Sequence, residues 1–275
     1  YNIQDDIYEV TQCHIDLRRK GGDVRVRKLS RPVDYITSSV SRSSSSVIRG
    51  KLKRSSFSTQ LSYGDIEFRD QVWAYYKMPL GGRDRQAHTQ FQPLGPAAPP
   101  ERVFETTSVW LTLPPNLRKK FNEKEFQAGL HSMAEAIKTA VTIQEFCDPA
   151  DVDAIELTDH PDTGQPTIFI HDTVPGGIGI AEQVYYDFEN VFRRGYRILK
   201  ECPNAIKAPD HLGCPLCVSE AWGDDESEVV NRPVAIKIME ELLLGDPILE
   251  RKSDADIESI LFRNGFKDLQ FVKSG

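Results

Sequence analysis

Three of the five cysteines lie close together late in the chain, in the run C-P-N-A-I-K-A-P-D-H-L-G-C-P-L-C from Cys202 to Cys217. The C-x-x-C pair of Cys214 and Cys217 is typical of a zinc half-site, because its turn directs both sulfurs at one centre. Cys202 can supply a third ligand, and His211 can supply a fourth. Three thiolates and one imidazole would form a closed, structural zinc site rather than a catalytic one.

Other interpretations of this cluster remain open. Asp210 and the distant Cys147 are weaker candidates for the fourth ligand. Two of the thiols can instead be ordinary buried residues that bind no metal. An iron–sulfur cluster fits less well, because the cluster has no fourth cysteine. The odd number of cysteines argues against a secreted disulfide framework.

A glycine-rich run, F-I-H-D-T-V-P-G-G-I-G, lies between an expected strand and an expected helix, where such loops can bind phosphate. It lacks the Gly-Lys-Ser/Thr of a P-loop, and its glycines do not have dinucleotide-binding spacing. His171 and Asp172 could form an acid–base or metal pair, but no nucleophile motif or third partner accompanies them. The sequence favours an aspartate that stabilises the turn, beside a packed histidine.

Charge is unevenly distributed along the chain. The 275 residues contain 34 Lys and Arg against 41 Asp and Glu, a net charge of −7. Residues 14–54 contain twelve Lys or Arg and three Asp, a formal charge of +9, which leaves −16 for the remainder. This segment predicts contacts to nucleic-acid phosphates, through Arg25, Arg27, Lys28, Arg49, Lys51, Lys53 and Arg54. Alternatively, it is a solvated edge hairpin whose cations discourage strand addition.

The first third of the chain has the pattern of β-structure. Alternating residues predict strands near 24–27, 33–35, 66–74 and 104–113. The Ser-rich stretch 37–58 is either a long hairpin with a polar tip or a mobile loop. Residues 79–100 contain five prolines, and we expect them to form an irregular loop.

The pattern changes after Pro115. Asn122 and Glu125 resemble a capping box, and apolar residues recur at helical spacing until Cys147. Short strands at 154–157 and 167–171 and three further helices should follow: one after Gly179, one starting near Pro233, and a last one near Ser253. We therefore expect an α+β fold, with an antiparallel, barrel-like β-rich segment at 1–117 and a mainly helical zinc-binding domain at 118–275.

These motifs, in their order, resemble a known family. The helix segment G-L-H-S-M-A-E-A, then C-D-P-A-D, the glycine-rich run and G-C-P-L-C-V are similar to the C-terminal zinc-binding domain of certain superfamily-two DEAD/DEAH-box helicases. These are the mitomycin-repair-factor type, related to fungal RecQ-four-like repair helicases. V-D-Y-I-T, Y-G-D-I-E-F and F-E-T-T-S-V-W-L resemble the β-rich segment that precedes that domain.

The resemblance implies ATP-dependent 3′-to-5′ DNA unwinding and DNA repair for the parent protein, and zinc held by four cysteines. This chain departs from that pattern, because Asn204 and Trp222-Gly223 stand where a further cysteine is usual. Either His211 replaces a cysteine, or the site has become a metal-free turn. The sequence contains no Walker or DEAD/DEAH motif, so we expect ATP and Mg²⁺ to bind only to motor domains outside it.

Two function classes follow. In the first, the chain is a non-catalytic accessory domain of such a helicase that engages single-stranded or forked DNA and braces the motor. In the second, it is a protein–protein assembly module of a bacterial antiphage defence complex. Catalysis by His171 and Asp172 is the least favoured reading. The chain lacks an apolar run of membrane-spanning length and an N-terminal signal pattern, and it starts with Tyr1. We expect an intracellular piece of a longer protein, cytoplasmic or, in a eukaryote, nuclear, with no membrane partner.

Overall fold

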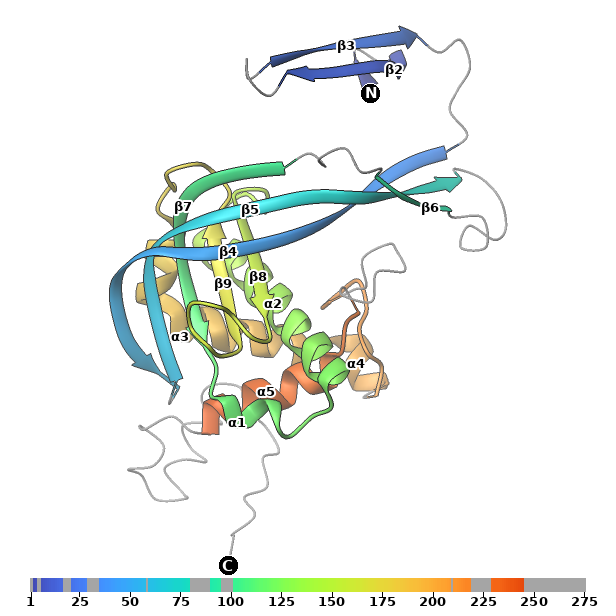
Figure 1. Cartoon of the computed structure of the whole chain (residues 1–275). Helices are drawn as coiled ribbons and strands as arrows, with labels where there is room; N and C mark the ends of the chain where they lie inside the picture. The colour runs from blue at the N-terminus through green and yellow to red at the C-terminus, as the bar shows by residue number, and fades with distance from the viewer. Residues whose placement is uncertain are drawn as a thin grey trace, which may run out of the picture. The chain divides into compact units, whose positions relative to one another are not determined.

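The computed structural model describes residues 2–3, 6–16, 21–28, 35–57, 59–79, 90–94, 101–208, 210–218 and 229–244. Its strands (Figure 1) are β1 (Asn2–Ile3), β2 (Asp6–Asp16), β3 (Gly21–Lys28), β4 (Tyr35–Ser56), β5 (Thr59–Pro79), β6 (Gln90–Pro93), β7 (Glu101–Thr112), β8 (Val152–Leu157) and β9 (Thr167–Asp172). Its helices are α1 (Pro115–Arg118), α2 (Glu123–Glu145), α3 (Ile180–Lys200), α4 (Pro203–Lys207) and α5 (Arg232–Leu244). The expected α+β class is confirmed. The helix expected near Ser253 lies outside the described residues.

The strands form two sheets. One has the order β1-β2-β3, and the other has the order β4-β5-β7-β9-β8, with β6 paired to β5. The larger sheet is open, because its edge strands β4 and β8 do not pair with each other. The expectation of a barrel-like segment is therefore wrong with respect to closure.

The chain divides into two compact units, Tyr1–Arg42 with Gln71–Pro100, and Ser43–Asp70 with Glu101–Gly275. This division does not coincide with the boundary expected at 117/118. Strand β7 lies before that boundary and β9 after it, yet the two pair directly in one sheet. The division into a β-rich segment at 1–117 and a zinc-binding domain at 118–275 stays a prediction.

In the first unit, β2 and β3 form an antiparallel pair, and β6 pairs with the distal part of β5. Strand β6 lies inside the segment expected to be an irregular loop, so that expectation is wrong for Gln90–Pro93. The residue that packs this strand onto β5 is Phe91, whose ring contacts Trp73 and Tyr76. A single apolar position is too short a pattern to predict a strand.

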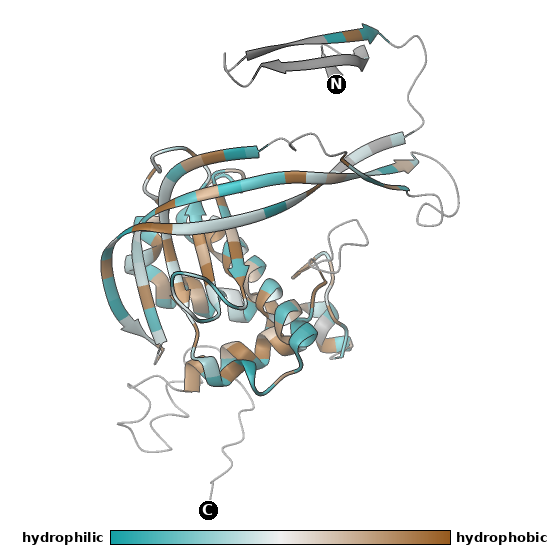
Figure 2. Ribbon diagram, in the orientation of Figure 1, coloured by the Kyte–Doolittle hydropathy of each residue, from teal (hydrophilic) through white to brown (hydrophobic). Residues whose placement is uncertain are grey.

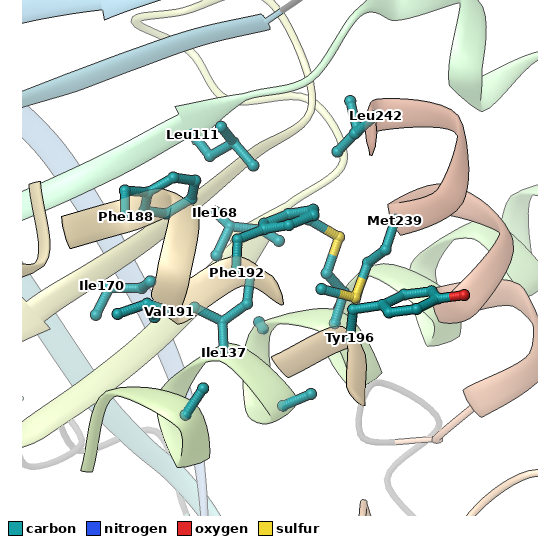
Figure 3. Close-up of a cluster of buried hydrophobic side chains, with 14 of the residues drawn as sticks. Leu111, Ile137, Ile168, Ile170, Phe188, Val191, Phe192, Tyr196, Met239 and Leu242 are labelled. Carbon is teal, nitrogen blue, oxygen red and sulfur yellow. The ribbon is translucent and has the colours of Figure 1, made fainter. Parts of the chain in front are cut away.

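In the second unit, α2, α3 and α5 pack together, and α2 and α3 also contact strands of the larger sheet. The helices carry separate hydrophilic and hydrophobic faces (Figure 2). The apolar faces supply a continuous core with β7 and β9, which includes Leu111, Ile137, Ile168, Phe188 and Phe192 (Figure 3). Such burial is the main stabilising contribution to a fold of this size.

Helix α2 begins at the capping box that the sequence predicts. The Asn122 side chain accepts a hydrogen bond from the Glu125 backbone N–H at 2.9 Å, and the Glu125 carboxylate accepts one from the Asn122 N–H. The helix ends at Phe146, which adopts a left-handed conformation with φ 52. The Phe146 side chain is 94% exposed. Its packing therefore does not offset the energetic cost of the left-handed conformation.

The Ser-rich stretch forms β4 and the start of a long hairpin with β5, which decides between the two sequence interpretations. The turn of this hairpin carries Phe57, which is buried and stacks on Phe192 of α3 with ring centroids 4.8 Å apart. The turn is thus held by a buried apolar contact, and it is not the polar, solvated tip that the composition predicted.

We predict that Phe146→Gly raises the free energy of unfolding by about 1 kcal/mol, because glycine adopts the left-handed region without strain and no buried surface is lost. Phe146→Ala is the matched control and should change stability little, because alanine keeps the strained conformation. Chemical denaturation measures both. Equal effects of the two substitutions would show that the backbone conformation carries no cost.

Candidate metal centre and glycine loop

The sulfurs of Cys202, Cys214 and Cys217 lie together. The Cys202 and Cys214 Sγ atoms are 3.5 Å apart, and those of Cys214 and Cys217 are 3.6 Å apart. All three lie within 4.8 Å of one another. A tetrahedral zinc with Zn–S bonds of about 2.3 Å requires sulfurs separated by about 3.8 Å. The spacing therefore fits three ligands of one zinc ion, and it is too long for a disulfide bond.

Local backbone geometry positions the three thiols. Cys202 directly follows α3 and precedes α4. The knuckle closes through the Cys217 N–H, which donates to the Cys214 carbonyl at 3.0 Å, and the Cys214 N–H, which donates to the Val218 carbonyl at 2.6 Å. A Cβ at Gly213 would overlap the Val218 carbonyl and the Val230 side chain. Glycine is therefore required for this close approach.

Helix α5 holds the same loop in place. Arg232, at the start of α5, is buried. Its backbone N–H donates to the Leu212 carbonyl at 2.6 Å, and its side chain donates to the carbonyl of His211 at 3.2 Å. The cysteine loop is therefore fixed between the end of α3 and the beginning of α5.

The two knuckle thiols differ in acidity. Burial opposes ionisation of Cys214, but hydrogen bonds from the Leu216 backbone and the Asn204 side chain lower the pKa of its thiol to about 7. At Cys217 burial dominates and raises the pKa of the thiol to about 11. Zinc binds thiolates, so metal binding to this pair would release protons.

The candidate fourth ligands lie outside the group of three. The exposed His211 ring accepts a hydrogen bond from the Gly213 N–H at Nδ1, at 3.3 Å, which leaves Nε2 as its nitrogen for a metal. Asp210 is also exposed. Cys147 follows the C-terminal end of α2 and does not belong to the thiol group. His211 as fourth ligand stays a prediction.

The glycine-rich run forms a loop that Asp172 organises. This carboxylate is fully buried and accepts hydrogen bonds from the backbone N–H groups of Ile178 at 2.6 Å, Gly179 at 2.9 Å and Ala181 at 2.9 Å. It also accepts one from the Thr107 hydroxyl at 3.1 Å. A carboxylate at the start of α3 is favourable, since it meets unpaired N–H groups and the positive end of the helix dipole. Asp172 thus stabilises the turn, as the sequence favoured.

His171 points to the other side of β9. It is buried and stacks on Phe68 with ring centroids 4.6 Å apart. Burial lowers the pKa of its imidazole to about 4, so the ring is neutral at pH 7. A neutral, stacked ring and a carboxylate saturated by hydrogen bonds agree with the packed histidine and turn aspartate that the sequence favoured over a catalytic pair.

The basic residues differ in their local partners. Arg25, Arg27 and Lys28 lie exposed on β3. On β4, Arg49 and Lys51 both pair with Asp65, at 2.8 and 2.5 Å. Lys53 is exposed. These placements leave their predicted role in nucleic-acid binding open.

Arg54 has a structural partner that sequence reasoning missed. Its guanidinium forms two hydrogen bonds with the Glu189 carboxylate and one with the Tyr185 carbonyl at 2.7 Å. Ser56 donates to the same carboxylate at 2.8 Å. The Arg54 hydrogen bonds hold the pKa of Glu189 below its usual value against the opposing effect of burial. Arg54 therefore fastens β4 to α3. The two residues are 135 positions apart, so no local sequence pattern predicts that they pair.

The fold and the cysteine cluster describe an α+β region with a zinc-type knuckle, and comparisons with known proteins agree. Residues 133–218 match the family described as the MrfA Zn-binding domain. A crystal structure of the DUF1998 helicase MrfA bound to DNA matches with a TM-score of 0.57 and 24% identity, covering 88% of this chain and 29% of that chain. At this identity, the structural match shows the fold alone.

Two curated relatives also match. The uncharacterized ATP-dependent helicase YprA of Bacillus subtilis is 28% identical over 162 residues, covering 58% of this chain and 20% of the relative. An uncharacterized protein of Methanocaldococcus jannaschii is 36% identical over 76 residues, covering 28% of this chain and 62% of the relative. The chain thus spans about a fifth of the helicase and under two thirds of the other relative. Its resemblance to the C-terminal region of MrfA-type helicases is confirmed.

Within the described part of the chain, no helix has both the length and the apolar character that a membrane span requires.

We predict that the purified chain binds about one equivalent of zinc, and that Cys214→Ser abolishes stoichiometric binding because a thiolate ligand is lost. Cys147→Ser is the matched control and should retain the metal, since its sulfur lies outside the group. Elemental analysis measures both. Less than one equivalent of any metal in the unaltered chain would show that the cluster is a metal-free turn.

A second prediction concerns two neighbouring glycines of the loop. Gly176 and Gly177 both have positive φ, 83 and 77, but only a Cβ at Gly177 would overlap the Thr107 side chain. Gly177→Ala should therefore destabilise the fold by about 1–3 kcal/mol more than Gly176→Ala. Thermal unfolding measures this difference. Replacing Thr107 with Ala in the Gly177→Ala background should recover part of the loss, and equal effects at both glycines would contradict the packing argument.

Proposed function

We propose that this chain is a non-catalytic accessory region of an ATP-dependent 3′-to-5′ DNA helicase that acts in DNA repair. In this role it contributes contacts to single-stranded or forked DNA and braces the motor domains, which lie on the same or another polypeptide. Zinc bound by Cys202, Cys214, Cys217 and His211 would be structural. ATP and Mg²⁺ would act only on the motor.

The combined match in sequence and fold supports this proposal most strongly. The family match at 133–218 contains the glycine loop and the C-x-x-C pair, and the fold match extends over most of the chain. The three clustered thiols fit the zinc-binding description of that family. The helicase relative of Bacillus subtilis is much longer than this chain, which supports a motor elsewhere in the parent protein.

A structural metal fits the position of the cluster. The cysteine loop joins α3 to α5, and both helices contribute to the main core. Zinc would cross-link the chain after α3 to the cysteine loop, which Arg232 of α5 also holds. It would thereby stabilise the helical layer, since the binding free energy of a structural metal contributes to folding. A helical layer restrained by zinc would give the motor domains a rigid surface to pack against.

DNA engagement would use cations that are exposed on the strands. Arg25, Arg27 and Lys28 form an exposed basic run on β3. Lys53 is exposed on β4, whereas Arg54 is committed to Glu189. Contacts of this kind give affinity without sequence preference and make binding strongly dependent on salt.

An assembly module is the second candidate, and one observation favours it. Phe146 projects almost fully into solvent, and Ile143, one turn earlier in α2, is 46% exposed. Burial raises the pKa of the Cys147 thiol, and the nearby carboxylates of Asp151, Glu145 and Asp148 raise it further. An exposed apolar pair among acidic groups suits a protein partner better than DNA. A helicase motor encoded in the same polypeptide would favour the first candidate, and a separate open reading frame would favour the second.

We predict that replacing Arg25, Arg27 and Lys28 together with Glu weakens binding to single-stranded DNA severalfold and makes the salt dependence shallower by about two units of slope. Fluorescence anisotropy across a salt series measures both quantities. The matched control replaces Lys119, Lys207 and Lys237 with Glu, the same charge change on exposed helical-half positions. If the two triple variants lose equal affinity, only net charge matters and the β3 assignment is wrong.

A further inference from the structure

A large groove lies within the second unit, beside the β4–β5 hairpin turn. Its cavity volume is about 1150 Å³, slightly above the usual range of about 300–1,000 Å³ for sites of single small molecules. One wall is formed by residues 50–55 of β4, and the opposite wall by residues around Thr163 in the β8–β9 turn. The end of β7, with Trp110 and Thr112, also lines it.

The groove extends over three neighbouring strands and includes the edge strand β4. Successive side chains of a strand point to opposite faces, yet all six residues from Gly50 to Ser55 line the same cavity. Gln60 and Ser62 of β5 and Trp110 and Thr112 of β7 line it as well, so the cavity lies over a face of the sheet and reaches its edge at β4. Strand β4 is indeed an edge of its sheet, with β5 as its neighbour among the described strands.

The β8–β9 turn occupies this edge only at one end. The Asp162 carboxylate accepts a hydrogen bond from the Val47 N–H at 2.7 Å, and the His160 ring bonds the Ser45 carbonyl at 3.0 Å. These contacts attach the β8–β9 turn to β4 beside the groove. Farther along β4, residues 50–55 line the cavity.

The chemical character of the groove suits phosphate. Three cations line it, Lys51, Lys53 and Arg54, against one carboxylate, Asp162. Lys51 pairs with Asp65 and Arg54 with Glu189, so among the described residues Lys53 is the lining cation without an ion pair. The other polar lining groups are hydroxyls and amides. Thr112 is 7% exposed, and its Oγ1 has no hydrogen-bond partner within the described structure. An unpaired buried hydroxyl is costly, and an acceptor that enters the groove would satisfy it.

The described lining of the groove offers no exposed aromatic ring on which a base could stack. Trp110 is the aromatic side chain of the lining, but it is 5% exposed and stacks on Phe169 with ring centroids 5.6 Å apart. A ligand would therefore be held by its backbone and not by its bases. An acidic peptide could also use the strand edge, but it would need pockets for alternate side chains, whereas the lining is mainly polar.

We propose that this groove binds the phosphodiester backbone of one nucleic-acid strand, with Lys53 contacting phosphates and the Thr112 hydroxyl donating to a phosphate oxygen. Arg54 is a positioning residue, since its pairing with Glu189 holds the β4 wall against α3. This inference rests on the proposed function, because it assigns a site to the DNA engagement suggested above.

The test is fluorescence anisotropy of the whole chain with a labelled oligothymidylate about twenty nucleotides long, sufficient for site sizes of about 4–16 nucleotides. Lys53→Glu should weaken binding about tenfold, and Thr112→Val about fivefold, since each loses a hydrogen bond or charge contact to phosphate. Thr112→Val should leave thermal stability equal or higher, because the unpaired hydroxyl is removed. Lys237→Glu is the charge-matched control and should bind as the unaltered chain does.

Competition identifies the ligand chemistry. An abasic oligomer of the same length should compete within about twofold of oligothymidylate, as expected for contacts to the backbone alone. Oligouridylate and inorganic polyphosphate test RNA and free phosphate chains as sources of the same chemistry, and competition by either supports a phosphate site. Competition by polyglutamate as strong as that of oligothymidylate would overturn it in favour of an acidic protein segment.

Two results separate this inference from the proposed function. If the unaltered chain binds the oligonucleotide and the Lys53 and Thr112 variants bind as the Lys237 variant does, the groove is wrong while DNA engagement stands. If the unaltered chain does not bind at low salt, both are overturned.

Discussion

The arrangement of the second unit depends on one buried carboxylate. Asp172 stands at the end of β9 and accepts hydrogen bonds from three backbone N–H groups of the loop and first turn of α3, and from Thr107 of β7. A buried charge is tolerated only when it is fully hydrogen-bonded or paired, so this set of donors fixes the start of α3 against the sheet. The glycine at 177 permits the close approach of the loop to Thr107.

Helix α3 in turn positions both candidate sites. Glu189, in its middle, binds Arg54 and Ser56 and so holds the β4–β5 hairpin. Phe192 packs against Phe57 at the hairpin turn. At its end, the chain passes directly to Cys202 of the thiol cluster. The groove beside β4 and the metal centre are therefore attached to the middle and to the C-terminal end of one helix. A structural zinc would restrain the same helix that supports the groove.

The elements with strong local patterns could be predicted from the sequence. Asn122 and Glu125 are near neighbours in the chain, so the start of α2 follows from capping chemistry alone. The cysteine spacing predicted a thiol cluster, which the structure places together. The role of Asp172 was foreseen only in outline, because its partners include Thr107, a distant residue. Arg54 counted as a surface cation in the sequence, since its partner Glu189 lies 135 residues away. Whether the sheet is open or closed could not be predicted either. Strand pairing is long-range, and local alternation does not specify which strands become edges.

We expect Cys202, Cys214 and Cys217 to hold a structural zinc ion. X-ray absorption spectroscopy of the metal-loaded chain tests this expectation most directly, because it reports the number and type of atoms bound to zinc. The expected first shell contains three sulfurs at about 2.3 Å and one nitrogen at about 2.0 Å, as for a Cys₃His site. A shell of nitrogen and oxygen without sulfur would contradict this assignment.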